Sequence, residues 1–285
     1  MRTGRGSSIG RATGNYLAGK RQAARGGLEK LMSTVPAPEP FPAMMRHWRG
    51  MRRVSQLELA LRANVSARHV SFLETGRARP SRGMVLTLAA ALEVPLAQRN
   101  ELLGAAGFAP AYRARGSGDT ALRLPEAALA WMLDRHAPYP GFALDRHWRL
   151  LRINQPAKRL LGAAGLGVGD SLLDASGPDG RLRELIVNWP DVASYLASRL
   201  QTELEHHGED QVLASHLEAI RRDAPARGEV PKAAILPVIY RLGGQQLAFF
   251  STIAHFGGAD DIALDDIRIE LMFPADEETE VLLSG

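Results

Sequence analysis

A short segment near residue 67 carries side chains that could read the edges of DNA bases. Arg68 could donate two hydrogen bonds to guanine O6 and N7, and Ala67 could contact a thymine methyl group. One helical turn later, Phe72 falls on the face opposite the apolar positions of the segment, where it could pack on a thymine methyl or a sugar. The segment also carries Ser66, His69 and Ser71, which offer further polar groups beside Ala67, Arg68 and Phe72.

Basic and amide side chains surround this segment and could contact phosphates. Residues 41–80 carry eight arginines against two acidic residues. Phosphate contacts position a protein on DNA without specifying a sequence. The alternative is an ordinary solvated basic face. The predicted phosphate-contacting arginines are Arg77, Arg79 and Arg82, with Arg46, Arg49, Arg52 and Arg53 as further candidates.

Patterns that would support an enzyme or a metal site are weak in this sequence. The chain has no cysteine, which excludes thiol catalysis, iron–sulfur clusters and Cys-ligated zinc. The glycines at 165, 167 and 169 follow a predicted helix rather than a strand, so they favour a loop over a phosphate site. His206, His207, His216 and Glu203 lack a familiar ligand spacing. We therefore expect no catalytic residue, no metal and no cofactor.

Charge divides the chain of 285 residues into two unlike parts. Residues 1–115 carry 19 Lys and Arg against 6 Asp and Glu, and the remainder carries 16 against 25. A basic first part could meet nucleic acid or an anionic membrane surface. No apolar run approaches the roughly 20 residues of a membrane span, and the start lacks the apolar core of a signal peptide. We expect a cytoplasmic protein.

Short helical patterns fill residues 41–107. Helices are predicted over 44–53, 67–74 and 98–105, with one more after Ser55 and one more after Ser81, and the alternating prolines of 36–42 predict that no helix includes them. Ser55 and Glu58 form a Ser-x-x-Glu capping box, and Ser66 and Ser81 are further N-cap candidates. In the second helix, Leu57, Ala60 and Leu61 are expected to face inward. These helices predict an all-α helix-turn-helix domain.

The motif Ser55-Gln56-x-x-Leu59-Ala60-x-x-Ala63-x-Val65-Ser66-x-x-x-Val70-Ser71-x-Leu73-Glu74-x-Gly76-x-x-x-Pro80-Ser81 resembles the lambda-repressor-like, or XRE, DNA-binding domain. The resemblance implies that the helix of residues 67–74 enters the major groove and that Gln56 touches a phosphate. The base-reading set that it implies is Ser66, Ala67, Arg68, His69, Ser71 and Phe72. It also implies a homodimer on a pseudo-palindromic, double-stranded operator.

The acidic part reads as a mixture of strands and helices. Short strands are predicted over 141–144, 148–153, 234–242, 246–256 and 267–273, with Gly243 and Gly244 as a hairpin turn. Helices are predicted over 125–136, 154–162, 182–186, 192–206 and 211–222; residues 163–180 are predicted to be loop, and an acidic tail ends the chain. The pattern predicts an α+β, PAS-like domain with helices on one face of the sheet.

Four segments of this part resemble the C-terminal domain of MmyB-like transcriptional regulators: Tyr139-Pro140-x5-Asp145-Arg146-x-Trp148, Ile186-Val187-Asn188-Trp189, Phe249-Phe250-Ser251-Thr252-Ile253-Ala254-x-Phe256-Gly257 and Phe273-Pro274-Ala275-Asp276-Glu277. The resemblance implies a PAS-like domain that binds a small apolar ligand, with a fatty acid as one candidate. The alternative for each strand residue is a place in the core. The predicted ligand contacts are Phe142, Leu144, Leu151, Ile153, Asn154, Trp189, Phe250, Ile253, His255 and Phe256, with Asn188 as a further polar candidate.

We therefore expect a ligand-responsive, sequence-specific transcription regulator that is not an enzyme. Two alternatives stay open, namely a C-terminal domain that binds a protein partner, as an antitoxin does, and one with an unrecognised enzymatic activity. The expected divisions are a disordered basic extension over 1–40, a DNA-binding domain over 41–110, a linker over 111–124 and a ligand-binding domain over 125–285. The alternative for residues 1–40 is an arm that contacts DNA phosphates.

Overall fold

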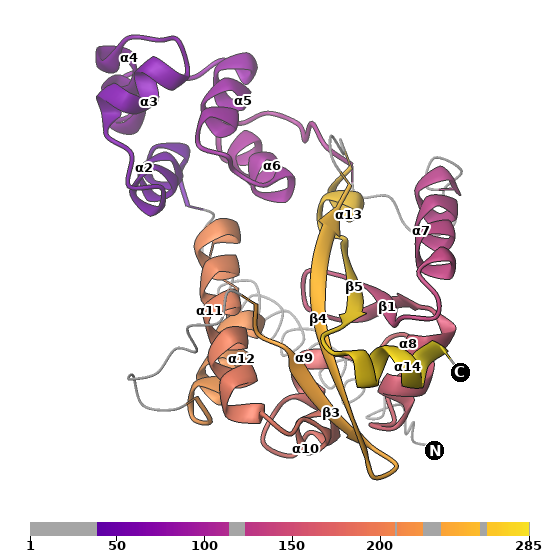
Figure 1. Cartoon of the computed structure of the whole chain (residues 1–285). Coiled ribbons are helices and arrows are strands. Elements are labelled where there is room, and N and C mark those ends of the chain that lie inside the picture. Colours follow the sequence, from indigo (N-terminus) through magenta and orange to yellow (C-terminus); the bar gives the residue numbers. More distant parts are fainter. Residues whose placement is uncertain (1–38, 114–122, 209, 225–234, 257–260, 285) are drawn as a thin grey trace, which may run out of the picture. The chain divides into compact units, whose positions relative to one another are not determined.

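The computed structural model of the chain describes residues 39–113, 123–208, 210–224, 235–256 and 261–284. The expected disordered extension therefore lies almost entirely outside the described residues, as does most of the expected linker. Figure 1 shows the described helices and strands: a group of short helices at the N-terminal side, and a second group that combines a sheet with helices.

The N-terminal domain is entirely helical, as its sequence pattern predicts. Its helices are α2 (Phe41–Met51), α3 (Gln56–Arg62), α4 (Ala67–Glu74), α5 (Arg82–Ala91) and α6 (Leu96–Ala105). Serine side chains cap three of them, because the hydroxyls of Ser55, Ser66 and Ser81 accept hydrogen bonds from backbone N–H groups three residues later. The helix pair α3 and α4, joined by a short turn at Asn64 with φ of 53°, forms the helix-turn-helix.

Two expectations for this domain were wrong. Pro42 lies inside α2, because proline is tolerated in the first turn of a helix, where its missing N–H has no intrahelical partner. Leu57 and Leu61 are 62% and 73% exposed, and the buried face of α3 carries Leu59 and Ala60 instead. The predicted inward face of α3 therefore does not coincide with its buried face.

The C-terminal domain is built on one antiparallel sheet. Its strands are β1 (Gly141–Leu144), β2 (Leu150–Ile153), β3 (Val238–Leu242), β4 (Gln245–His255) and β5 (Arg268–Pro274), in the order β2-β1-β5-β4-β3. The hairpin between β3 and β4 turns at Gly243 and Gly244, whose φ angles of 55° and 84° favour glycine. The sheet and its helices confirm the predicted α+β class.

Helices lie on both faces of this sheet, which corrects the expectation of a single covered face. They are α7 (Arg123–Arg135), α8 (Gln155–Gly162), α9 (Leu172–Ala175), α10 (Arg181–Leu185), α11 (Trp189–His207), α12 (Gln211–Arg221), α13 (Ile262–Asp265) and α14 (Glu277–Ser284). Leu133 of α7 packs with Ala143 and Ile269 on one face, whereas Phe142 and Leu144 point into a larger cluster on the other. All four residues of β1 are buried for this reason.

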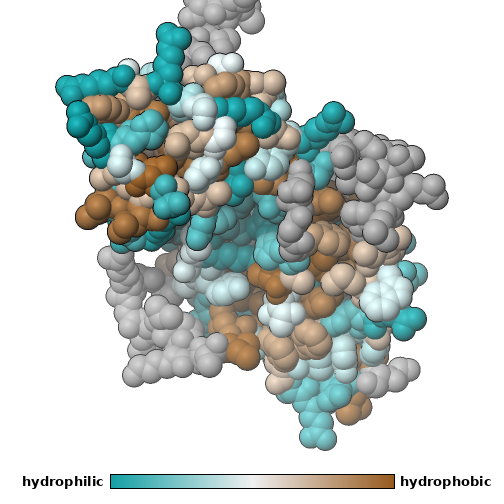
Figure 2. Space-filling view, turned by 90° about the horizontal axis from the view of Figure 1, so that it is seen from above, coloured by the Kyte–Doolittle hydropathy of each residue, from teal (hydrophilic) through white to brown (hydrophobic). Residues whose placement is uncertain are grey.

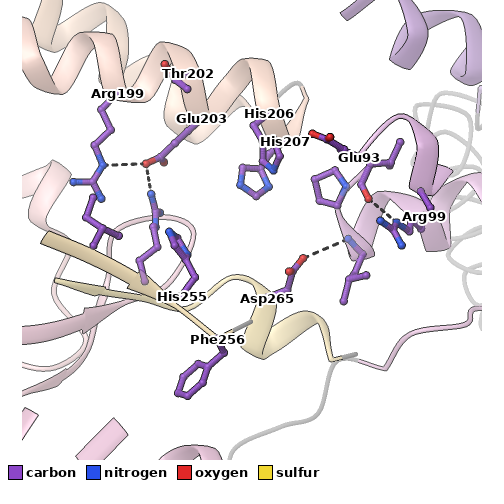
Figure 3. A pocket seen from close by; sticks show the side chains of 16 residues that line it. Glu93, Arg99, Arg199, Thr202, Glu203, His206, His207, His255, Phe256 and Asp265 are labelled. Carbon is purple, nitrogen blue, oxygen red and sulfur yellow. Dashed lines mark hydrogen bonds and ion pairs between the residues drawn. The ribbon is translucent and has the colours of Figure 1, made fainter. Parts of the chain in front are cut away.

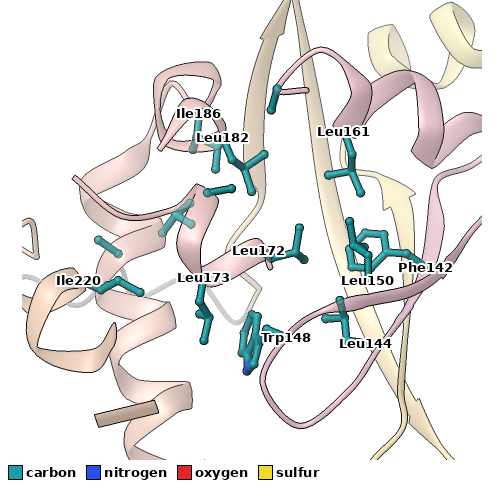
Figure 4. Packing of buried hydrophobic residues seen from close by; sticks show 14 of the residues in the cluster. Phe142, Leu144, Trp148, Leu150, Leu161, Leu172, Leu173, Leu182, Ile186 and Ile220 are labelled. Atoms are coloured by element: carbon teal, nitrogen blue, oxygen red, sulfur yellow. The ribbon is translucent and has the colours of Figure 1, made fainter. Parts of the chain in front are cut away.

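The larger cluster forms the core between the sheet and α8–α12. Figure 4 shows Trp148, Leu150 and Leu172 packed together within it. The predicted loop of residues 163–180 contains α9, which places Leu172 and Leu173 in this core. Burying these apolar side chains stabilises the domain by roughly 25 cal/mol for each Å² of apolar surface removed from water. This burial is the main stabilising contribution in such a domain.

One buried amide holds several parts of the domain together. Asn154 is 4% exposed, and its Oδ1 accepts hydrogen bonds from the N–H groups of Gly141 and Ala157 at 3.0 and 2.9 Å. Its Nδ2 donates to the carbonyls of Leu133 and Tyr139 at 3.0 and 2.9 Å. Asn154 thus caps α8, as predicted, and also ties α8 to β1 and α7.

The predicted acidic tail is a helix, α14, rather than an extended end. Asp276 caps it by accepting a hydrogen bond from the Thr279 N–H at 2.8 Å. The Thr279 hydroxyl is fully buried and accepts a hydrogen bond from the Ala248 N–H of β4 at 2.9 Å. Acidic side chains in the first turn suit the positive end of the helix dipole. None of the helices in the described ranges is long and apolar enough to span a bilayer.

Candidate DNA interface and ligand cavity

Helix α4 exposes one face and buries the other. Val70, Leu73 and Glu74 are buried, whereas Arg68 is exposed and its neighbours Ala67, His69, Ser71 and Phe72 are partly exposed. The six residues predicted to read bases therefore lie at the cap and on the accessible side of one helix. Figure 2, which looks down on this domain, shows hydrophilic side chains projecting from its outer edge.

Arg68 has a single described contact, and it is within its own helix. Its guanidinium carbon lies 5.1 Å from the ring centroid of Phe72, four residues later. A cation over an aromatic ring is attracted by the ring quadrupole. Phe72 can therefore hold the Arg68 side chain along the accessible face of α4.

Glu74 at the end of α4 connects three helices. Its carboxylate, 1% exposed, accepts hydrogen bonds from Arg49 Nε at 2.7 Å and Nη2 at 3.0 Å. It also accepts one from Gln56 Nε2 at 2.8 Å, and the Glu74 carbonyl accepts one from Arg46. The hydrogen bond with Glu74 raises the pKa of the Arg49 guanidinium. These bonds fix α4 against α2 and α3.

The structure divides the candidate phosphate contacts into two groups. Arg46 and Arg49 bind Glu74, and Arg52 donates to the Leu92 carbonyl at 2.9 Å, so these three have structural partners. The side-chain amide of Gln56 donates to Glu74, so the amide predicted to contact a phosphate already has a partner within the domain. Within the described part of the chain, no ion pair or hydrogen bond from the side chain is found for the exposed residues Arg53, Arg77, Arg79 and Arg82.

The C-terminal domain contains a cavity of about 480 Å³ between α11 and the sheet. Small-molecule sites typically have volumes of about 300–1,000 Å³ and mostly apolar walls. Burial raises the pKa of the Tyr240 hydroxyl in its wall, so this side chain is a neutral phenol. The apolar lining residues are Phe142, Trp148, Leu161, Leu172, Leu182, Ile186, Val192, Tyr195, Leu196, Ile235, Leu236, Val238 and Tyr240. We call this space the α11 cavity.

Of the ten predicted ligand contacts, Phe142 lines the α11 cavity. Leu144, Ile153 and Trp189 belong to the core cluster around it, and Leu151 is 42% exposed on β2. Asn154 and Asn188 are occupied by backbone hydrogen bonds, and Phe250 stacks on Phe273. Ile253, His255 and Phe256 lie at the far end of β4 and do not line the cavity.

Sequence reasoning missed the wall supplied by α11. Val192, Leu196 and Arg199 recur at i, i+4 and i+7, so all three face the same side of the helix. That spacing is visible in the sequence and could have indicated a lining helix. The aromatic residues of the predicted strands were assigned to the site instead.

Charged side chains gather on one side of the cavity, around Trp148. Its indole Nε1 donates to Glu203 Oε2 at 3.0 Å, and the guanidinium carbons of Arg199 and Arg268 lie 4.2 and 5.2 Å from its ring centroid. Figure 3 shows the contact between Arg199 and Glu203. Glu203 also pairs with Arg268, and neither Glu203 nor Arg268 lines the α11 cavity itself. Burial lowers the pKa of Arg268, although the charge of Glu203 acts in the opposite direction.

Metal binding finds no support in the geometry of the described residues. No group of three or more His, Asp or Glu side chains there converges in a way that could hold an ion. His216 lies 3.4 Å from Asp174, while His206 and His207 stack edge to face at the end of α11.

Comparison with known proteins bears on both domains. Residues 43–102 match the model of a helix-turn-helix domain. Residues 125–284 match the model described as the MmyB-like transcription regulator ligand binding domain. No curated protein matches the chain significantly. Among solved structures, the chain is similar to the PAS domain from Bordetella pertussis BvgS at 13% identity, with a TM-score of 0.29, covering 57% of this chain and 94% of that one.

The order of the two matches along the chain is that of a regulator with an N-terminal reader of DNA and a C-terminal sensor. The ligand-binding model covers more than half of the chain, and the helix-turn-helix model covers the domain that presents α4. The chain is therefore a DNA-binding transcription regulator and belongs to the MmyB-like family.

Proposed function

We propose that this regulator reads a pseudo-palindromic operator as a homodimer through α4, and that a small apolar ligand in the α11 cavity modulates its DNA binding. The proposal that a ligand binds rests on the α11 cavity, which has a volume of about 480 Å³ and a mostly apolar wall inside the ligand-binding domain. An acyl chain of the fatty-acid type suits such a wall, because burying each CH₂ group contributes about 0.8 kcal/mol.

The DNA half rests on the accessible face of α4 and on the exposed arginines beside it. Arg68 is the proposed reader of a guanine, and Arg77, Arg79 and Arg82 are the proposed phosphate contacts. In a dimer of such domains the two recognition helices enter major grooves about 34 Å apart. A footprint with two half-sites one DNA turn apart is therefore expected.

Ligand control requires that the ligand bind two arrangements of the protein with unequal affinity. By linkage, the factor by which the ligand changes the operator affinity equals the factor by which the operator changes the ligand affinity. Either titration measures the coupling, which typically amounts to about 5- to 150-fold.

The test first selects an operator from random DNA with the full chain and then titrates the complex with decanoate in a mobility-shift assay. A change in operator affinity is expected for the natural sequence. Leu196→Trp fills the α11 cavity and should abolish the response, whereas Leu151→Trp adds the same bulk to an exposed position on β2 and should preserve it. An equal response in both variants would contradict the proposed site.

The same preparation separates the alternatives. Native mass spectrometry of the full chain should reveal a bound small molecule if the domain is a sensor, and a stoichiometric protein partner if it resembles an antitoxin. We propose that the chain acts by binding rather than by catalysis. Turnover of the molecule that it retains would overturn that part of the proposal.

A further inference from the structure

Three polar side chains stand together in the mostly apolar wall of the α11 cavity, which Ser176, Asp191, Ser194 and Ser198 also line. They come from three elements: Arg199 from α11, Ser251 from β4 and Glu270 from β5. The Ser251 hydroxyl donates to Glu270 Oε1 at 2.8 Å, and Arg199 Nη1 lies 3.5 Å from Glu270 Oε2. One side of the cavity is therefore charged and hydrogen-bonded.

Arg199 is incompletely paired for a side chain that is only 11% exposed. Its Nε lies 3.4 Å from Glu203 Oε1 and its Nη1 3.5 Å from Glu270 Oε2, whereas charge-assisted hydrogen bonds usually measure about 2.7–2.9 Å. Its Nη2 is buried, and none of the described residues accepts a hydrogen bond from it. A buried donor without an acceptor costs free energy, so this atom is a reason to expect an acceptor from outside the chain.

Both carboxylates near Arg199 have other donors. Glu203 binds Arg268 and accepts a hydrogen bond from Trp148 Nε1 at 3.0 Å. Glu270 accepts from Ser251. If Arg199 turned toward a new anion, neither carboxylate would be left without a partner.

Trp148 lies against the Arg199 guanidinium. The guanidinium carbon is placed over the indole ring at 4.2 Å from its centroid, where the ring quadrupole attracts a cation. Trp148 itself has a φ of 60°, a conformation that is costly for a bulky side chain and is held only where the surroundings over-determine it. With Nε and Nη1 facing Glu203 and Glu270, the Nη2 N–H groups remain for an added anion.

We propose that Arg199 anchors the carboxylate of the ligand, so that the α11 cavity selects a free acid over a neutral ester or alcohol of the same chain. This inference rests on the proposed function and names the head group that the same site recognises. The apolar wall takes the chain, and Arg199 Nη2 meets the acid. A neutral head group there would offer the buried Nη2 donor of Arg199 no charged acceptor.

The experiment compares decanoate, methyl decanoate and 1-decanol by isothermal titration of the full chain. The natural sequence should bind decanoate about 10- to 100-fold more tightly than the other two, which is the range expected for hydrogen bonds to a charged group. Arg199→Met keeps the length of the side chain and should bring the three affinities together. Arg152→Gln, an exposed arginine on β2 outside the cavity, should keep the preference for the acid.

The outcomes separate this inference from the proposed function. If the natural sequence binds 1-decanol as tightly as decanoate, the proposal that Arg199 anchors a carboxylate is wrong, whereas the proposed apolar ligand site is still supported. If it binds neither, both fail. Because the head-group comparison on the natural sequence needs no variant, it remains decisive even if Arg199→Met does not fold. Retention of the acid preference in a folded Arg199→Met protein would also overturn the anchor.

Discussion

The buried carboxylate of Glu74 accepts two hydrogen bonds from the guanidinium of Arg49, at 2.7 and 3.0 Å. Glu74 closes α4 and Arg49 lies in α2, so this pair sets the position of the helix that presents Arg68. The third hydrogen bond of the carboxylate comes from Gln56 at the start of α3. Glu74 is one of the few acidic residues of this basic domain. Because it is buried against Arg49, it orders that arginine inside the domain and does not present a negative charge to DNA.

Glu74→Gln should destabilise the protein by about 3 kcal/mol, since removing one charge of a buried ion pair leaves the other uncompensated. Chemical denaturation of the full chain measures the loss. Glu58→Gln is the matched control, because it breaks an exposed ion pair between Glu58 and Arg62 on the neighbouring helix and should cost less than about 1 kcal/mol. Equal losses would show that the Glu74 pair has no special role.

Arg68→Ala should cost about 1–3 kcal/mol of operator binding and relax the preference at one base pair. Arg79→Ala should instead weaken binding to operator and random DNA alike, and should lower the slope of the salt dependence by about one charge. Binding assays with operator, single-base variants and random DNA at several salt concentrations distinguish the two. Loss of affinity without any change in base preference would remove Arg68 from base reading.

Stability should fall as the pH drops from about 6.5 to about 4. Burial, helped by the nearby charge of His206, lowers the pKa of His207 to about 4. An unfolded histidine has a pKa near 6.5, so between these values the unfolded state binds more protons, and its free energy falls relative to that of the folded state as the pH drops. The contribution of neutral His207 to the free energy of unfolding is complete above pH 6.5 and amounts to about 3 kcal/mol at most.

His207→Gln should flatten this part of the stability profile, measured by urea unfolding at a series of pH values. His47→Gln, a change at an exposed position on α2, serves as the control and should leave the profile as steep as in the natural sequence. An unchanged slope in His207→Gln would refute the assignment.

Asn154→Ala should be among the costly substitutions of the C-terminal domain. It removes the N-cap of α8 and leaves buried carbonyls of Leu133 and Tyr139 without their donor, for a loss of about 2–4 kcal/mol. Thermal unfolding monitored by circular dichroism measures it. The neighbouring exposed position provides a comparison, because Gln155→Ala should shift the midpoint little.

The sequence predicted those features of the fold that depend only on residues close together in the chain. The N-caps at Ser55, Ser66 and Ser81 are satisfied within three residues, so their positions could be predicted from the sequence. The phase of α3 could not, because a helix of seven residues takes its orientation from neighbours such as Glu74, which are distant in sequence. The capping box is also incomplete, since the Glu58 side chain pairs with Arg62 instead.

The candidate sites divide in the same way. The accessible face of α4 depends on one helix, so its exposure was predictable from periodicity, whereas its reading of bases stays a prediction. The α11 cavity depends on six or more elements meeting across more than a hundred residues, so single strands gave little indication of its wall. Arg199 acquires its significance only from the positions of Trp148, Glu203 and Glu270, which no spacing in the sequence reveals.

The indole of Trp148 gives the chain an optical signal at the cavity. Two guanidinium groups lie 4.2 and 5.2 Å from its ring, and its N–H is held by a carboxylate, so its excited state senses a strong local field. Any molecule that draws Arg199 away from the ring alters that field and with it the colour and yield of the indole emission. Occupancy of the sensor could thus be followed in the unlabelled protein, by light emitted from the wall of the site itself.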